Sequence, residues 1–291
     1  MKRSVVILGV VLVAILLVAA GPDVLSTDRG AVVFRPRAVT EDVVSYVRGL
    51  ADGSSFAYGR WDERSLLDGL GSRVLTSYRY MVSAGLLAVV LGPLLGTWLT
   101  AGRRDRTKDV VATVGAVPNF ILALLLQIGV VAVYKATGFR LAHVATIDLS
   151  RQAVFLPLLV LTLAPTIYLI RSVSSRVYQV TSEQYILAAK ARGLGRLRIY
   201  RTHVLLNVTR FLRADLARVA GVILADFFIV DYLFNLRGIT TFIFFGMNRG
   251  NGGYRYGLAV NGLLVALFLY LGVYLTLRVF VVLVESLAVR A

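Results

Sequence analysis

Residues 181–207, TSEQYILAAKARGLGRLRIYRTHVLLN, form a basic stretch between long apolar segments, and the organisation of the chain follows outward from it. Thr181 and Gln184 have capping-box spacing, which would satisfy two backbone donors at the start of a helix. Lys190 and Arg192 fall in the last turn, where the helix dipole favours cations, and Gly193 can adopt the left-handed conformation that ends a helix. The stretch therefore predicts a short, bounded helix, about 16 Å long at ~1.5 Å per residue.

The rest of the chain has the composition of a membrane protein. Of its 291 residues, 57% are hydrophobic and 16% are charged, and the mean hydropathy is +0.75. This is too apolar for a soluble domain. The chain has no cysteine, which excludes disulfides, thiolate metal sites and cysteine nucleophiles. We therefore expect an all-α polytopic membrane protein.

The N-terminal residues 1–21 begin with Lys2 and Arg3 and continue as an apolar run. A cleaved signal peptide would fit the basic start and the small residues at the end of the run. A retained first transmembrane helix fits the ~17-residue lower limit for crossing the hydrocarbon core. Retention is preferred, because the chain downstream is itself a membrane protein and needs no secretion signal.

Residues 22–79 are the one long polar stretch, in which eight arginines balance eight acidic residues. A balanced loop of this length can be translocated despite its arginines. We expect a small, partly helical extracytoplasmic subregion. The alternative is a solvated connector with no specific role.

Five further apolar runs are each long enough to span a membrane as a helix: residues 80–101, 110–134, 153–170, 216–235 and 257–283. Four prolines lie inside these runs, where neighbouring helices can satisfy the backbone groups that proline frees: Pro93, Pro118, Pro157 and Pro165. Residues 80–291 are therefore expected to form a five-helix core of kinked helices, and the N-terminal helix makes six.

The charges of the connecting loops predict the orientation. Residues 102–109 carry four basic residues, and residues 171–213 carry nine Lys or Arg against the single acid Glu183. With both loops in the cytoplasm the positive-inside rule is obeyed, and both termini are cytoplasmic. The net charge of +16 then belongs to this topology and to anionic lipid headgroups. Nucleic-acid binding is not expected.

Several segments of this chain resemble one known family. Residues 183–194, EQYILAAKARGL, resemble the EAA coupling loop of ABC-importer permease subunits, in the subgroup that imports dipeptides, oligopeptides and nickel. Four further segments are similar to that subgroup, within a resemblance that runs from about residue 43 to the C-terminus: residues 46–59, 117–120, 203–207 and 230–238. The family's proline after the coupling loop has no counterpart near Phe211.

The resemblance implies a type I ABC-importer permease fold in a bacterial-type cytoplasmic membrane. It implies alternating access and no covalent chemistry, with a cavity formed together with a second permease. The other implied partners are two ABC ATPase subunits or domains, an extracytoplasmic substrate-binding protein and the surrounding lipid. None of the four lysines follows a glycine, so the chain lacks the phosphate-cradling loop GxxxxGK[ST]. ATP and Mg²⁺ would be bound by the partner ATPases, and this chain needs no cofactor.

The coupling loop, residues 181–207, has the properties of a docking surface. Its small residues let the groove of a partner approach the backbone closely, and its basic residues can pair with acids on that partner. The resemblance assigns ATPase coupling to Glu183, Tyr185, Ala188, Ala189, Lys190, Arg192 and Gly193. The alternative is an interfacial helix that binds anionic lipid.

Three polar residues are candidates for the transport pathway: Asn119, Asp226 and Asp231. Ionisable groups at membrane depth are costly and are functional candidates by default. We hypothesise that Asp226 faces the central cavity and interacts with a peptide amino group or another cation. The alternative is a structural role, as a hydrogen bond between helices or an ion pair with Arg218. Asp231 matches an acidic position of the family.

Two other classes of function are compatible with a polytopic chain. An ion-coupled secondary transporter would show inverted repeats with broken helices and several buried charges, and no convincing internal repeat is present. A membrane-anchored scaffold would leave the proline-containing helices and the bounded basic helix without a purpose. An ATP-driven importer subunit is therefore the preferred interpretation.

Overall fold

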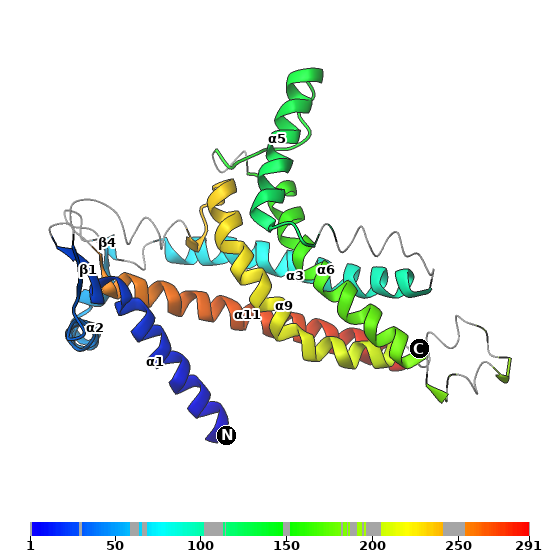
Figure 1. Ribbon diagram of the computed structural model, residues 1–291, viewed down its shortest axis with the longest axis horizontal. Helices are drawn as coiled ribbons and strands as arrows, with labels where there is room; N and C mark the ends of the chain where they lie inside the picture. Colours follow the sequence, from blue (N-terminus) through cyan, green and yellow to red (C-terminus); the bar gives the residue numbers. More distant parts are fainter. Residues whose placement is uncertain are drawn as a thin grey trace. The chain divides into compact units, whose positions relative to one another are not determined.

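The computed structural model describes residues 2–28, 31–58, 64–65, 69–101, 113, 115–147, 152–181, 183–184, 186, 191–193, 195, 205–240 and 254–290. Its α-helices, drawn in Figure 1, are α1 Lys2–Val24, α2 Ala38–Asp52, α3 Leu70–Ala101, α5 Asn119–Thr137, α6 Phe155–Thr181, α9 Leu205–Phe234 and α11 Tyr256–Arg290. The chain divides into two compact units, Met1–Leu75 with Arg237–Phe268, and Thr76–Leu236 with Leu269–Ala291.

Four of the described helices are long and apolar enough to cross a membrane. They contain the segments Leu70–Thr100, Asn119–Thr137, Phe155–Thr181 and Tyr256–Leu287. In the part of the chain that the structure describes, α1 contributes the shorter apolar segment Gly9–Val24. The 30-residue α9 carries charged side chains along its length. The helical membrane class is confirmed, whereas the count of six spans and the positions of the termini stay predictions.

Two boundaries differ from the sequence expectation. Within the described part of the predicted run 110–134, helix α5 starts at Asn119, and Pro118 precedes it with an extended backbone at φ −58° and ψ 136°. Proline disfavours helical conformation in the residue before it and often lies at a helix start. Thr181 does not open a helix either. It ends α6, and its hydroxyl donates back to the carbonyl oxygens of Val177 and Tyr178.

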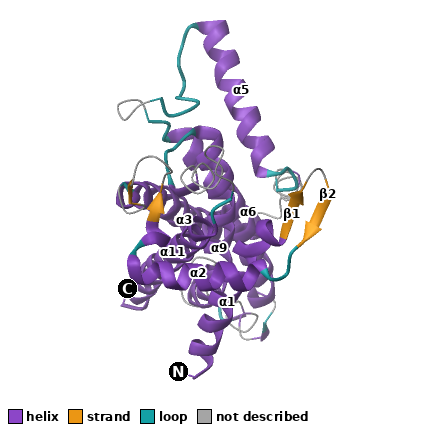
Figure 2. Cartoon of the chain, turned by 90° about the vertical axis from the view of Figure 1, so that its left-hand side faces the viewer, coloured by secondary structure: helices purple, strands orange, loops and turns teal. Residues whose placement is uncertain are grey.

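The polar segment 22–79 is partly helical, as expected, and also contains short strands. Besides α2 and the 3₁₀ helix η1 Ser54–Phe56, it contains two antiparallel strand pairs. Strand β1 Leu25–Asp28 pairs with β2 Ala31–Phe34, drawn as orange arrows in Figure 2, and β3 Ala57–Tyr58 pairs with β4 Arg64–Ser65. The β1–β2 register places Leu25 opposite Phe34, and such short hairpins depend on neighbouring packing for stability.

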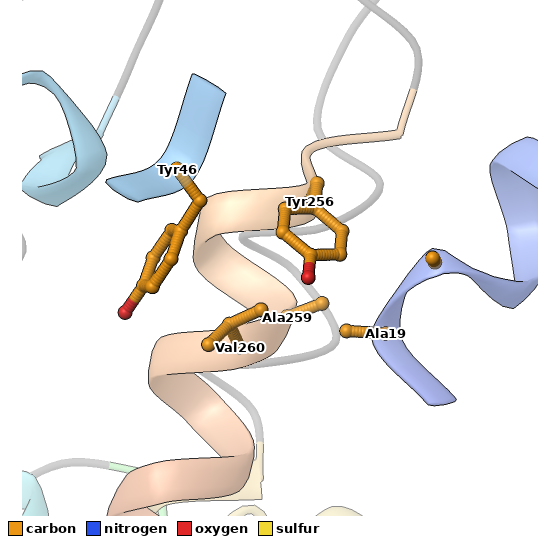
Figure 3. Close-up of a cluster of buried hydrophobic side chains, with 6 residues drawn as sticks. Ala19, Tyr46, Tyr256, Ala259 and Val260 are labelled. Carbon is orange, nitrogen blue, oxygen red and sulfur yellow. The ribbon is translucent and has the colours of Figure 1, made fainter. Parts of the chain in front are cut away.

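The first unit joins the start of α11 to the other elements through aromatic and small side chains. Tyr46 of α2 and Tyr256 of α11 meet edge to face with ring centroids 5.9 Å apart, and they cluster with Ala19, Ala259 and Val260 (Figure 3). The Tyr256 hydroxyl donates to the carbonyl of Leu16 at 3.1 Å. These contacts give the unit a buried core that joins α1 and α2 to the start of α11.

The second unit is held by close packing between helices. On α3, Gly92 lies against Leu169 of α6, and a Cβ built on Gly92 would lie 2.4 Å from the Leu169 Cβ. One turn later, Ser174 donates a hydrogen bond of 2.9 Å to the carbonyl of Gly96. Small residues allow such approach between membrane helices, where packing replaces the hydrophobic driving force.

Gly92→Ala should destabilise the second unit, because the added methyl overlaps Leu169. Overpacking of this kind costs about 1–3 kcal/mol, more than the ~1 kcal/mol of helix propensity that alanine gains over glycine. Thermal unfolding of the detergent-solubilised protein measures the effect. The matched control is Gly221→Ala in α9, where a Cβ would meet nothing within 4 Å. Equal melting temperatures for the two variants would contradict this packing.

Candidate functional site

The predicted coupling loop is described in part. Glu183, Arg192 and Gly193 are exposed, whereas Tyr185, Ala188, Ala189 and Lys190 lie outside the described residues. Gly193 has φ 78°, the left-handed conformation expected of a residue that ends a helix. The prediction that Gly193 adopts the left-handed conformation at the end of a helix is confirmed.

The loop is carried by an antiparallel pair of helices, α6 and α9, which pack along each other (Figure 1). Residues 182–204 connect the end of α6 to the start of α9. At the ends of the pair nearest the loop, four buried valines form a small core: Val173, Val177, Val180 and Val208. We call residues 168–181 of α6 with 205–218 of α9 the coupling stem. It continues beyond the end of the predicted span 153–170.

Polar contacts join the same two helices further from the loop. The Asp215 carboxylate of α9 accepts hydrogen bonds from the Tyr168 hydroxyl at 3.0 Å and from the Ser172 hydroxyl at 2.5 Å. The Arg218 guanidinium lies over the Tyr168 ring, 5.5 Å from its centroid. Hydrogen bonds to a charged acceptor are stronger than neutral ones. The carboxylate therefore holds α6 and α9 at a fixed offset.

A cation–π contact and an ion pair complete the stem. The Arg176 guanidinium lies 4.4 Å from the centroid of the Phe211 ring, within the range of a favourable cation–π interaction. Arg213 pairs with Glu285 of α11.

The sequence interpretation assigned no role to the residues that join α6 and α9 in the stem. The contact face of α6 could have been recognised from its spacing. It carries residues that recur every four positions and so share one side of the helix: Tyr168, Ser172, Arg176 and Val180.

Two of the three pathway candidates meet in the structure. The Asn119 side-chain amide, at the start of α5, donates a 2.6 Å hydrogen bond to Oδ2 of Asp226 on α9. Of the two structural alternatives for Asp226, the hydrogen bond between helices is formed, whereas the ion pair with Arg218 is not, since Arg218 lies over Tyr168. A carboxylate has about four acceptor positions. One hydrogen bond therefore leaves Asp226 able to bind a further donor.

The third candidate, Asp231, follows Asp226 on α9 and is fully buried. Its backbone carbonyl accepts a hydrogen bond from the amide of Leu236, where α9 ends. Nearby, the Gln127 side chain of α5 donates to the carbonyls of Val144 and Leu233. These contacts join helix ends and loops near Asp231, whereas Asp226 has acceptor positions left for a ligand and is the stronger pathway candidate.

Comparison with known proteins identifies the family to which most of these helices belong. A family described as "Binding-protein-dependent transport system inner membrane component" matches residues 88–288. The match contains α5, α6, α9 and the loop between α6 and α9. It therefore covers more than half of the chain, including the coupling stem and the Asn119–Asp226 pair.

Curated relatives agree with the family match. The chain is 30% identical over 179 residues to the dipeptide transport system permease protein DppB of Bacillus subtilis (strain 168), covering 60% of this chain and 56% of the relative. It is 24% identical over 192 residues to DppB of Lactococcus lactis subsp. cremoris (strain MG1363), covering 64% and 60%. It is 29% identical over 152 residues to the oligopeptide transport system permease protein OppB of Mycobacterium tuberculosis (strain ATCC 25618 / H37Rv), covering 46% of each.

The matched region thus spans between 46% and 60% of the length of these relatives. Within that region lie long apolar helices and a basic loop carried on a packed helix pair. On the family match, this chain belongs to the inner membrane components of binding-protein-dependent transport systems, and it is a multi-pass membrane transport subunit.

Proposed function

We propose that this chain is one of two permease subunits of an ATP-driven importer of dipeptides or oligopeptides, or of a related small solute such as a nickel complex. The names of the relatives, dipeptide and oligopeptide permease proteins, support a peptide cargo. The observation that carries the proposal is the coupling stem within a chain of this family. It presents a basic loop at the end of a helix pair beyond the apolar span.

The stem gives the proposed mechanism a physical basis. A loop that receives the motion of an ATPase must pass it on without deforming. Buried valines and a carboxylate that bridges two hydroxyls resist sliding of α6 against α9, because packed interfaces switch between discrete arrangements and do not deform continuously. Movement of the loop then rotates both helices together. A cavity between the two permeases would open alternately to either side.

The proposal includes an orientation and a set of partners. The loop 182–204 and both termini face the cytoplasm of a bacterial-type cell, and residues 22–79 face outward. Two ATPase subunits bind ATP and Mg²⁺ and dock at the exposed Glu183, Arg192 and Gly193, together with Tyr185, Ala188, Ala189 and Lys190. A binding protein delivers the cargo from outside.

Co-purification tests the assembly directly. A tagged copy of this chain, expressed with its neighbouring reading frames, should purify with a second permease and an ATPase. The reconstituted complex should hydrolyse ATP faster when its binding protein and cargo are added. A chain that transported cargo by itself, driven by an ion gradient, would favour the secondary-transporter class instead.

Gly193→Val should uncouple ATP hydrolysis from uptake. Gly193 has φ 78°, and a residue with a side chain in the left-handed region is strained by about 1–2 kcal/mol. A strain of ~1.4 kcal/mol shifts the equilibrium between the native loop and its alternatives about tenfold against the native loop. Cargo taken up per ATP hydrolysed should therefore fall in proteoliposomes, by at most about tenfold.

The matched control is Gly193→Asn, because asparagine tolerates the left-handed region better than valine. It should retain most of the coupling. If both variants coupled like the parent protein, the geometry at Gly193 would play no part in docking.

Asp226→Asn should weaken uptake of peptides that carry a free amino group. The substitution keeps the size of the side chain and its contact with Asn119 but removes the negative charge, which attracts an ammonium group. Uptake of a dipeptide should fall by about tenfold, the equivalent of ~1.4 kcal/mol, whereas its N-acetylated form should be unaffected. Asn119→Ala is the control. It removes the hydrogen bond and retains the charge, so the preference for free amino groups should remain. An unchanged preference in Asp226→Asn would exclude Asp226 from cargo binding.

A further inference from the structure

The first unit contains a pocket of about 290 Å³. It lies where α2 and η1 meet the first turn of α11. Its polar lining comes from Ser45 and Tyr46 of α2, Ser54 and Ser55 of η1, and Arg255 just before α11. None of these residues belongs to the coupling stem or the Asn119–Asp226 pair. The pocket therefore needs an explanation of its own.

The walls of the pocket are fixed by a ring of buried and partly buried hydrogen bonds. The Tyr46 hydroxyl donates to Oδ1 of Asn261 at 2.7 Å, and the Asn261 amide donates to the Ser55 carbonyl at 2.8 Å. The Ser55 hydroxyl closes the ring by donating to the Tyr46 carbonyl at 2.8 Å. Burial raises the pKa of Tyr46, which keeps its hydroxyl protonated and able to donate. A pre-organised wall lowers the ordering cost of binding.

Arg255 is the charged residue among those that line the pocket. Within the described part of the chain, its guanidinium has no hydrogen-bond or ion-pair partner. The nearby carboxylate of Asp52 is already used, because it accepts the Ser54 amide at 2.9 Å. The contacts with Ser54 lower the pKa of Asp52, so this acid stays ionised and bonded within its own loop. An unpaired guanidinium beside serine hydroxyls favours an anion, and its planar fork suits a carboxylate.

The size and setting of the pocket narrow the choice of anion. Its volume lies at the lower end of the range of about 300–1,000 Å³ typical of small-molecule sites, which is room for one side chain. The α2 wall carries several charged residues, Glu41, Asp42, Arg48 and Asp52. Charged residues of this density place α2 in water and not among acyl chains. The occupant should therefore arrive from the aqueous side.

We propose that this pocket receives an acidic side chain of the extracytoplasmic binding protein, with Arg255 as its ionic partner. The inference rests on the proposed function, since it needs a binding protein that docks on the outer face. Family membership itself names a dependence on a binding protein. An arginine in a pre-formed pocket would orient that protein on the permease and speed its encounter. The other source of an anion at this position is the phosphate of a lipid headgroup.

The test uses the complete transporter in nanodiscs of phosphatidylcholine and its purified binding protein. The dissociation constant is measured at low and high salt for the parent protein, Arg255→Gln and Arg255→Glu. We expect Arg255→Glu to weaken binding by about tenfold or more at low salt, and both variants to show a shallower salt dependence. The control is Arg48→Gln, which removes an exposed arginine of α2 that does not line the pocket. It should change the affinity less than twofold.

A blocking experiment covers the case in which an Arg255 variant does not assemble. The chain has no cysteine, so Ser54→Cys in a cysteine-free complex can be labelled with a neutral maleimide that fills the pocket without changing its charge. Labelling should weaken binding of the binding protein and leave ATP hydrolysis in its absence unchanged. Compensation offers a further check, since an acid-to-arginine change in the binding protein should restore affinity for Arg255→Glu.

Two results would overturn the proposal. The first is an unchanged affinity in both Arg255 variants and in the labelled protein. The second is an effect that occurs only in nanodiscs with anionic lipid, which would assign the pocket to a headgroup phosphate. Failure of the proposed function is separate. It would show as a parent complex whose ATP hydrolysis does not respond to the binding protein at all.

Discussion

The antiparallel contact between α6 and α9 is the interaction on which the functional part of this chain depends. Its contacts repeat along one face of each helix, from Val180 against Val208 to Ser172 against Asp215. Apolar packing and a charge-assisted hydrogen bond act here on the same pair of helices. Apolar packing favours discrete arrangements of the two helices over continuous sliding. A carboxylate that accepts two hydroxyls fixes the offset, because any slide leaves a partly buried charge without its donors.

Much of this arrangement could be predicted from the sequence. Apolar length identified the regions of the long helices, and loop charge indicated an orientation for them. The left-handed Gly193 followed from the rule that glycine ends helices. Thr181 was assigned to the wrong helix because a hydroxyl near a helix boundary can cap the next helix or bond back into the previous one. Which of the two bonds forms depends on where α6 ends. The buried valines of α6 continue to Val180, so that helix extends to Thr181.

The contacts between helices could not be predicted in the same way. Asn119 and Asp226 are separated by 107 positions, and their hydrogen bond depends on the packing of α5 against α9. The same holds for the pocket beside Arg255, whose walls come from two distant segments. The strand pairs of residues 22–79 were missed because four-residue and two-residue strands carry almost no periodic signal.

The ring of hydrogen bonds through Tyr46, Asn261 and Ser55 also has a consequence for biosynthesis. Tyr46 and Asn261 are 215 positions apart, and the donor Tyr256 is 240 positions from its acceptor Leu16. When α1 and α2 emerge from the ribosome, their partners in α11 have not been made. The first unit must therefore remain open while Thr76–Leu236 of the second unit is synthesised. The first unit can close only after α11 has been synthesised. A chain truncated before residue 256 would therefore lack the core of its first unit.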